Sequence, residues 1–473
     1  MLSSSASLEL EAEVECTVNC VGKNHNRQAV GIVQGGYLMT SYIVNLLKKK
    51  ILVGRRRAII GVIKYQLRKW TFSNVTEKLG LNILTREEVI KNSEKYKVLQ
   101  FGSEESITVS EPYNSSDNLP SFITKRVGTI TLKKPFVFEI TNAELIGPAA
   151  VGFDEDGNLI SETVTTTKKI GRNLPTRTLI SKKLPSLVTP HLDTACSLVH
   201  WWHTNYYHWL MQSLTKIEGL EYYQEQTGIK PTLIIPSNPP SWKIESLRLL
   251  GYEPDNCIQW NRSKLKVKRL VVPSFQHSAS DQLVSPTACR WLRQRVFSNL
   301  PNVDSKQISC SSRIYISRPK TAGRRIINED DVLEALIPFG FVAYTLENLS
   351  FSDQVKLFSQ AEIVVSPHGA GLTNIIFAQN LTVIELFGSF GIPTLFFLAK
   401  ALGFQYACLM SDHNKRNQYS DKFNGIMMDI DKFQAQYNDI MVDVSRLQAL
   451  VAEMLYVYTK TSPSTLSNER RLA

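Results

Sequence analysis

From residue 197 onward the chain repeats one pattern, in which a short apolar run is followed by a segment with helical spacing and then by another apolar run. Apolar strands that alternate with amphipathic helices form parallel sheets covered by helices on both faces. The expected strands lie at residues 197–201, 232–237, 257–260, 268–274, 313–318, 342–346, 362–366 and 382–387. A polar stretch at 301–312 divides them into two sets. The sequence therefore predicts an α/β protein with two Rossmann-like, doubly wound domains facing a cleft.

A chain of 473 residues is too long for a single hydrophobic core. We expect a basic helical N-terminal extension over residues 1–70, an N-terminal domain over 71–300 and a C-terminal domain over 301–473. Before the first parallel set, alternation over 136–164 predicts paired strands, with a turn at 154–158 in which Gly157 tolerates a positive φ. The acidic residues of that turn are therefore not expected to bind a metal ion.

The extension carries most of the excess positive charge of the chain. Nine basic residues and no acidic ones occur between Lys48 and Lys69, and apolar residues recur every three or four positions from Tyr37 to Trp70. Such basic amphipathic helices can lie on an anionic membrane surface. The alternative is a surface helix packed on the body of the protein. Because the charge is local, lipid head groups fit this segment as a partner and nucleic acid does not.

Several features predict a location in the cytoplasm, with possible attachment to the inner face of the plasma membrane. The first residues are polar and acidic rather than typical of a signal peptide, and no run of about 20 apolar residues occurs. The seven cysteines are scattered and odd in number, a pattern that favours a reducing compartment over a disulfide framework.

The stretch 362–376, EIVVSPHGAGLTNII, predicts an anion site. A buried strand runs into a glycine-bearing turn at Gly369 and Gly371, and helical spacing begins again at Leu372, with Thr373 and Asn374 in the first turn. Free N–H groups and the positive end of a helix dipole attract phosphate at such a position, and glycine permits close approach.

A second basic stretch lies just upstream, where Arg318, Lys320, Arg324 and Arg325 fall within eight residues. The planar guanidinium group matches phosphate oxygens, so these side chains predict a phosphate-bearing ligand. At least one of these arginines is also expected to be simply solvated, and Glu329 can serve only as an N-terminal acid of the next helix.

The segment 201–209, WWHTNYYHW, follows the first strand of the first parallel set, so it is expected at the carboxyl edge of that sheet. Aromatic faces suit sugar rings, and asparagine and histidine provide directed hydrogen bonds. His208, at the start of a helix, is favoured over His203 as a general base. The alternative is that these aromatic residues fill the core between the domains.

Two further residues have open roles. His368 directly precedes the glycine turn and either holds a phosphate or a sugar, or braces the turn. Glu385 ends the strand at 382–387, where a carboxylate can accept hydrogen bonds from ribose hydroxyls or act as a surface or capping group.

The order of these motifs resembles glycosyltransferase family 61. The resemblance extends over about residues 143–387 and rests on NYYHWL, then SR…RR..NE, then PHGAGLTN, then VIEL. It implies a GT-B fold, an inverting reaction and a nucleotide-sugar donor, with a UDP-sugar favoured, bound mainly by the C-terminal domain. Residues implied to bind the donor or organise its loop are Arg318, Arg324, Arg325, Asn328, Glu329, His368, Gly369, Gly371, Thr373 and Asn374. Asn205 and His208 are implied to face the acceptor.

The sequence and this resemblance thus predict an inverting glycosyltransferase of capsule or exopolysaccharide biosynthesis, bacterial and cytoplasmic, acting on a glycan or lipid-linked acceptor. No cofactor is required by the sequence, no metal ligand is assigned, and dependence on a divalent metal stays open. The alternative is a non-catalytic glycan-binding or membrane-associated scaffold protein of the same fold. A nucleotide-dependent oxidoreductase is disfavoured because no GxGxxG turn follows a first strand.

Overall fold

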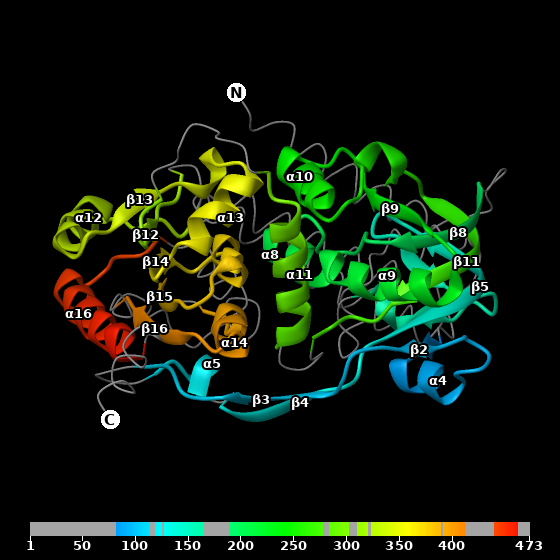
Figure 1. Ribbon diagram of the computed structural model, residues 1–473, viewed down its shortest axis with the longest axis horizontal. Helices are drawn as coiled ribbons and strands as arrows, with labels where there is room; N and C mark the ends of the chain where they lie inside the picture. The colour runs from blue at the N-terminus through cyan, green and yellow to red at the C-terminus, as the bar shows by residue number, and fades with distance from the viewer. Residues whose placement is uncertain are drawn as a thin grey trace, which may run out of the picture.

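The computed structural model describes residues 82–113, 119–124, 127–164, 190–277, 283–301, 310–319, 323–388, 391–411 and 439–461. The expected basic N-terminal extension lies outside these residues. Within them the protein is an α/β structure built around two separate sheets, with helices packed between the sheets and outside them (Figure 1). In the part of the chain described, no helix is both long and apolar enough to cross a bilayer.

The first sheet has nine strands and is mixed, with parallel pairs at both edges and antiparallel pairs in between. The strands are β1 (Ile83–Leu84), β2 (Leu99–Gln100), β5 (Phe136–Ile146), β6 (Val151–Phe153), β7 (Leu159–Ile160), β8 (His191–Ser197), β9 (Thr232–Pro236), β10 (Ile258–Trp260) and β11 (Lys264–Pro273). They follow the order β1-β7-β6-β5-β11-β8-β9-β10, and β2 also pairs with β5. Strands β11, β8, β9 and β10 are parallel, whereas β5 joins β11 antiparallel.

The expectation of a doubly wound first domain is therefore only partly correct. The paired strands expected at 136–164 are present, and they extend the same sheet as the parallel strands. The predicted turn is confirmed between β6 and β7, where Gly157 has φ +83° and the Asp154 carboxylate accepts from the backbone and side chain of Asn158. The first strand of the parallel set ends at Ser197, earlier than expected.

Helices of the first half connect or follow the strands of its sheet. They are α4 (Arg86–Lys91), α8 (Tyr206–His208), the π-helix η3 (Trp209–Leu214), α9 (Lys216–Thr227), α10 (Ser241–Leu249) and α11 (Pro286–Ser298), with short 3₁₀ turns η2 (Ser161–Thr163) and η4 (Pro254–Asn256). Helix α11 begins at Pro286 because Ser285 is its N-cap and proline is favoured at the first helical position. The π-helical turn in the middle of α8–α9 is a feature frequently found at functional sites.

The second sheet is fully parallel, as predicted. Its strands are β12 (Arg313–Ile316), β13 (Val342–Tyr344), β14 (Ile363–Pro367), β15 (Thr382–Phe387) and β16 (Gln405–Met410), in the order β13-β12-β14-β15-β16. Its helices are α12 (Glu329–Leu336), α13 (Phe351–Ser359), α14 (Thr394–Ala401) and α16 (Val444–Thr461), with 3₁₀ segments η5 (Ile337–Phe339), η6 (Leu346–Asn348) and η7 (Ala370–Phe377). Every residue of β14 and β15 is buried, as expected for strands covered on both faces.

The strand order of the second sheet fixes where a ligand would bind. The chain leaves β12 toward β13 on one side and returns to β14 on the other. Ligands of open parallel sheets bind at such a reversal, outside the carboxyl ends of the two strands. In this protein those ends are followed by Arg318 and by the Gly369 turn.

The two halves pack directly on each other through helices. Helices α8, α10 and α11 of the first half contact α13 and η7 of the second (Figure 1). Glu245 of α10 accepts hydrogen bonds from the first backbone N–H groups of α13, those of Phe351 (2.8 Å) and Ser352 (3.0 Å). A carboxylate at this position satisfies unpaired donors and complements the helix dipole. The same hydrophobic core cluster contains residues of both halves.

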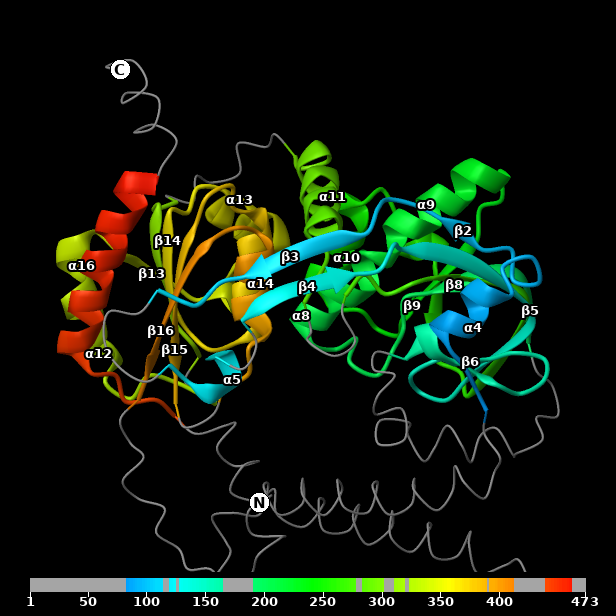
Figure 2. The same cartoon turned by 90° about the horizontal axis from the view of Figure 1, so that it is seen from below.

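A two-stranded ribbon also connects the halves. Strands β3 (Glu105–Val109) and β4 (Gly128–Leu132) cross from one half to the other at the front of Figure 2, and the short helix α5 (Ser121–Thr124) lies beside the second sheet. Tyr113 forms a parallel bridge to Ala407 of β16, and the ring of Phe122 packs edge-on against Phe387. The division into two domains near residue 300 stays a prediction. The β3–β4 ribbon comes from the part of the chain before that division, yet β3 contacts α14 of the second half.

Candidate functional site

The glycine turn lies at the carboxyl end of β14, as expected, but a 3₁₀-helix rather than an α-helix follows it. The N–H groups of Gly369, Ala370 and Gly371 donate to no acceptor among the described residues, while the next amide, that of Leu372, bonds to the Gly369 carbonyl. The expected contribution of an α-helix dipole is therefore weaker than predicted. The predicted set of free amides is in place.

Both glycines of this turn have side chains close to them. The φ of Gly369 is 179°, which any residue can adopt. A Cβ at Gly369 would lie 3.1 Å from Nη1 of Arg318, and one at Gly371 would lie 2.8 Å from Cδ1 of Leu346. A side chain at Gly369 would thus displace the arginine that accompanies the turn.

Arg318 links the two strand ends. Its Nη1 donates to the carbonyl oxygen of His368 at 3.1 Å, across the reversal between β12 and β14. Burial, and then repulsion from Arg324, lower the pKa of Arg318 to about 10. Arg324 itself has a positive φ of 61°, an uncommon conformation for a side chain of this size. Two neighbouring guanidinium groups that are partly withdrawn from water form a site suited to a polyanion.

His368 is held by a buried carboxylate and a buried tyrosine. Its Nδ1 lies 2.5 Å from Oε1 of Glu385, and the hydroxyl of Tyr406 donates to Oε2 of the same carboxylate at 2.5 Å. The imidazole also stacks on Phe387, with ring centroids 5.0 Å apart. The Nδ1 proton therefore points at Glu385, and Nε2 hydrogen-bonds to no described residue.

The expected contact of Glu385 with a ribose is corrected by this arrangement. Glu385 has no exposed surface, and both of its oxygens already accept hydrogen bonds within the protein. The charge of Glu385, added to burial, raises the pKa of Tyr406 well above its usual value. The carboxylate acts on any ligand only through His368.

Tyr406→Phe should lower the free energy of unfolding by about 1–3 kcal/mol, because one oxygen of a buried carboxylate loses its donor. Urea denaturation would measure this change. Tyr315→Phe is the matched control: Tyr315 is equally buried, but its hydroxyl donates to Glu329, which water can reach. An equal loss of unfolding free energy in both variants would show that the Tyr406–Glu385 hydrogen bond stabilises the protein no more than the Tyr315–Glu329 hydrogen bond does.

The second group of polar residues lies at the start of α8. Nδ1 of His208 is 2.7 Å from Oε1 of Gln212, one helical turn later, and Nε2 of Gln212 is 3.1 Å from Nε2 of His277. An amide oxygen accepts, so Nδ1 of His208 carries the proton and its Nε2 keeps a free lone pair. The ring of Trp202 stacks on His208 at 5.8 Å. Burial lowers the pKa of His208, an effect that the Gln212 bond opposes, so the ring is neutral at pH 7.

The neighbouring histidines are poorer bases. Burial and then the charge of Lys243 lower the pKa of His203 to about 4, and Lys243 also donates to the His203 carbonyl. His200 is almost fully buried, and both of its ring nitrogens are occupied, by Ser213 and by the Trp202 amide. The preference for His208 over His203 therefore has a physical reason.

Asn205, Thr373 and Asn374 lie at the junction between the halves. Asn205 is exposed, and its side chain accepts weakly from the His208 amide, at 3.4 Å, as the cap of α8. Asn374 is fully buried; it accepts from the Tyr206 hydroxyl at 2.7 Å and donates to the carbonyl of Gly371 at 3.0 Å. Thr373 is also fully buried. The expected ligand contacts of Thr373 and Asn374 are thus corrected, since neither side chain reaches solvent.

Three residues predicted to surround the donor have partners within the protein, and two of them, Arg325 and Asn328, hold the chain that precedes α16. The Arg325 guanidinium pairs with Asp439 at 2.5 Å. Asn328 both donates to and accepts from the backbone of Val442. Glu329 accepts from the Tyr315 hydroxyl at 3.0 Å. Arg325 thus has a carboxylate partner, and Asn328 and Glu329 form hydrogen bonds within the protein, so their contact with a donor stays a prediction.

The two groups of residues meet because α8 packs on η7. Tyr206 lies two residues before His208, and its partner Asn374 binds the carbonyl of the glycine turn. Sequence reasoning missed Gln212, His277 and Tyr406, which orient the two histidines. The spacing of four between His208 and Gln212 was a usable signal for the first of these.

Metal ligands are not evident in this region. Within the described ranges, no cluster of three or more histidine, cysteine, aspartate or glutamate side chains has a geometry that could hold a metal ion.

Comparison with known proteins points to one family for part of the chain. Residues 206–384 match the family model described as Glycosyltransferase 61. This segment is similar to glycosyltransferase family 61. The family 61 segment starts at α8 and ends within β15, so it contains His208, Arg318 and His368 together and lies inside the range expected from the motifs.

Relatives of the family 61 segment are transferases by name. The chain is 31% identical over 110 residues to a beta-1,2-xylosyltransferase from Arabidopsis thaliana, covering 20% of this chain and 21% of the relative. It is 29% identical over 100 residues to an EGF domain-specific O-linked N-acetylglucosamine transferase from Gallus gallus (20% and 19%). It is 34% identical over 90 residues to a human protein O-linked-mannose beta-1,4-N-acetylglucosaminyltransferase 2 (18% and 16%). The chain thus spans about a fifth of the length of these relatives, and these plant and animal proteins lend no support to a bacterial origin.

Proposed function

We propose that the protein is an inverting GT-B-type glycosyltransferase that moves a sugar from a nucleotide-sugar donor to a hydroxyl group of a glycan acceptor. The observation that carries this proposal is that Arg318, with the charge of Arg324 near it, lies against the turn whose amides at residues 369–371 are free, at the strand-order reversal. Positive guanidinium groups and unpaired N–H donors at that position suit a nucleoside diphosphate.

In the proposed reaction the acceptor oxygen attacks the anomeric carbon of the donor. The bond from that carbon to the diphosphate oxygen breaks, and the electron pair leaves with the nucleoside diphosphate. The proton of the acceptor hydroxyl passes to Nε2 of His208. Attack from the face opposite the leaving group inverts the anomeric centre. Arg318, Arg324 and the turn amides stabilise the charge that develops on the diphosphate.

His208 suits the role of base for three reasons. Its Nδ1 proton is committed to Gln212, its Nε2 lone pair is free of described partners, and its lowered pKa keeps it neutral near pH 7. A general base must be unprotonated and correctly aimed before it can accept a proton. Asn205 maintains the start of the helix that carries it.

His368 is proposed to contact the donor through Nε2, with Glu385 and Tyr406 fixing the ring. A histidine whose Nδ1 proton is held by a carboxylate has a defined tautomer and orientation, as in catalytic triads. Its position directly before the free amides supports a contact with the diphosphate or the transferred sugar.

The choice of substrates is also a proposal. The relatives are named for xylose and N-acetylglucosamine transfer, so UDP-linked forms of these sugars are the first donors to test. A growing polysaccharide or lipid-linked glycan remains the proposed acceptor, in capsule or exopolysaccharide assembly. A cytoplasmic location, with membrane contact through the basic extension, is proposed from the sequence alone.

A panel of UDP, GDP, CMP and their sugars tests the donor site by thermal shift. A ligand that binds only the folded protein raises the melting temperature by mass action. We expect one nucleoside diphosphate to raise it and its monophosphate to do so less, because the arginines contact the terminal phosphate. Slow hydrolysis of the matching nucleotide sugar would separate an enzyme from a glycan-binding protein. A panel with no shift at millimolar ligand would refute the donor site.

A further inference from the structure

Trp202 is an exposed tryptophan that lies against the proposed base. It is 41% exposed, and in the described part of the chain Tyr456 is the only other phenylalanine, tyrosine or tryptophan with comparable exposure. The indole stacks on the imidazole of His208, with ring centroids 5.8 Å apart and planes at 21°. One face of the indole is therefore covered by His208, and its other face and its edge supply the exposed surface. A single exposed aromatic residue indicates little by itself. This one is distinguished by how it is held and by what lies beside it.

Hydrogen bonds fix the backbone that carries Trp202. Its N–H donates to Nδ1 of His200 at 3.2 Å, and its carbonyl accepts from the Asn205 amide at 2.9 Å. Burial lowers the pKa of His200 well below its usual value, so the ring is neutral. Because Nδ1 accepts, Nε2 carries the proton and donates to Oγ of Ser213 at 3.0 Å. The loop that carries Trp202 is thus tied to η3, the helical segment that directly follows His208.

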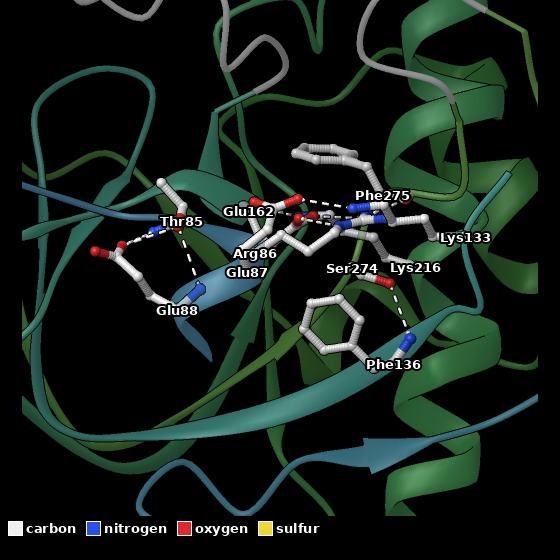
Figure 3. Close-up of polar contacts among 10 residues, drawn as sticks. All are labelled: Thr85, Arg86, Glu87, Glu88, Lys133, Phe136, Glu162, Lys216, Ser274 and Phe275. Carbon is white, nitrogen blue, oxygen red and sulfur yellow. Dashed lines mark hydrogen bonds and ion pairs between the residues drawn. The ribbon is translucent and has the colours of Figure 1, made fainter. Parts of the chain in front are cut away.

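His200 in turn packs against a residue whose own backbone is fixed. The rings of His200 and Phe275 meet edge-on, with centroids 6.2 Å apart. Figure 3 shows that the Phe275 amide donates to Oε2 of Glu162 at 2.7 Å, and that Nη2 of Arg86 donates to the Phe275 carbonyl at 2.8 Å. Nζ of Lys216 lies 3.9 Å from the centroid of the Phe275 ring. The support of the exposed indole therefore extends into the interior of the first half. A contact surface held in this way loses little conformational entropy when a ligand binds.

The exposed indole offers an apolar face with a hydrogen-bond donor at its edge. Nε1 of Trp202 donates to no described residue, and the side-chain nitrogen of exposed Asn205 likewise has no described acceptor. A pyranose ring has the matching arrangement, because its C–H bonds cover its faces and its hydroxyl groups surround its edge. Such a ring can cover the indole while its hydroxyl groups accept from these two donors. The side chain of a serine or threonine has no comparable face with which to cover the indole.

We propose that Trp202 is the platform on which the acceptor sugar stacks, with one hydroxyl group of that sugar beside Nε2 of His208. The proposal rests on the function proposed above and deepens it, because it names the class of the acceptor. The hydroxyl group that attacks the donor belongs to a pyranose ring, and not to a serine or threonine of a protein.

Three substitutions of Trp202 separate a platform from a mere cover over His208. Trp202→Ala removes both the cover and the aromatic face. Trp202→Leu keeps an apolar cover but has no aromatic face, and it carries the test if Trp202→Ala does not fold. Trp202→Phe keeps a smaller aromatic face. Tyr456→Ala is the matched control, because Tyr456 is an exposed aromatic residue on α16 of the second half.

The probes are the methyl β-glycosides of xylose, glucose and N-acetylglucosamine, together with the N-acetyl N-methylamides of serine and threonine. Their binding to the full chain is measured by saturation-transfer NMR. We expect at least one glycoside to bind the wild type, with the strongest saturation on the axial ring protons of one face, and to bind more tightly than the two amino-acid probes. Its Kd should rise about fivefold in Trp202→Ala and Trp202→Leu, and less in Trp202→Phe. Tyr456→Ala should bind the glycoside as the wild type does.

The transfer assay distinguishes binding from an indirect effect on the base. Loss of the platform should raise KM for the acceptor more than it lowers kcat. A lower kcat with unchanged glycoside binding would mean that Trp202 only positions His208, and the platform would be refuted. The same conclusion would follow if no glycoside bound the wild type, if Trp202→Ala bound as tightly as Tyr456→Ala, or if an amino-acid probe bound best.

The donor nucleotide separates failure of the platform from failure of the proposed function. Its thermal shift should be the same in the wild type and in all variants, because Trp202 is assigned to the acceptor alone. If the platform is refuted and the nucleotide shift is retained, the proposed donor site stands. If glycoside binding is lost in Trp202→Ala and Trp202→Leu but no nucleotide shifts the wild type, the platform stands and the donor site is refuted.

Discussion

Arg318→Ala should reduce sugar transfer by ~10²–10³-fold, the usual effect of removing one preorganised donor from a developing anion. Arg318 is the side chain that joins the ends of β12 and β14 and lies against Gly369. The nucleotide-induced thermal shift should also shrink, because the arginine contacts the diphosphate in the bound state as well. Enzyme assays with a nucleotide sugar and thermal melts of the same sample would measure both effects.

The same substitution should not destabilise the ligand-free protein. Burial and the nearby charge of Arg324 lower the pKa of Arg318 to about 10, so the folded state disfavours its charged form. Its removal should leave the melting temperature unchanged or slightly higher, which is the behaviour of a residue kept for function at the expense of stability.

Arg325→Ala is the internal control, because this neighbour is paired with Asp439. It should transfer sugar at close to the wild-type rate. If Arg325→Ala lost as much activity as Arg318→Ala, the placement of the diphosphate between β12 and β14 would be wrong.

His208→Ala should lower transfer by ~10²–10⁴-fold while nucleotide binding persists, since a general base contributes about that much. The pH profile gives an independent test in the wild type. Because the pKa of His208 is lowered below its usual value of about 6.5, kcat/KM should hold at pH 6.5 and fall only at lower pH, as the free base becomes protonated.

His203→Ala, in the same segment, is the control for that experiment. The pKa of His203 is about 4 and its Nδ1 lies near Lys243, so it has little capacity to act as a base. We expect His203→Ala to change the rate of sugar transfer only slightly and to leave the fall of kcat/KM at low pH unchanged. A normal rate in His208→Ala would assign the proton transfer to another group.

The second sheet could be predicted from the sequence because its central strands are buried on both faces. Such strands appear as uninterrupted apolar runs bounded by turn residues, and β14 and β15 are of this kind. β16 was missed, since its run Gln405–Met410 follows α14 after a short turn and begins with a polar residue. The first sheet was predicted only in part, because local patterns do not show that a hairpin joins a distant parallel set.

The candidate site divides in the same way. The residues that lie on the turn and beside it, Gly369 and Arg318, were correctly placed by local chemistry. Asn374 and Glu385 were assigned to a ligand because their partners could not be known: Tyr206 is 168 residues from Asn374, and Tyr406 is 21 residues from Glu385. Whether a polar side chain finds its hydrogen-bond partner within the protein depends on such long-range pairs. These pairs cannot be inferred from a single sequence.

The ribbon that crosses between the halves determines how this protein can be dissected. A fragment that begins after residue 300 would lack Tyr113, which pairs with the outer edge of β16, and Phe122, which covers Phe387 behind His368. An uncovered strand edge is a template for aggregation. Soluble expression of the second half alone should therefore require residues 105–124 to be supplied as well, either as a separate peptide or by rejoining the chain in a permuted order.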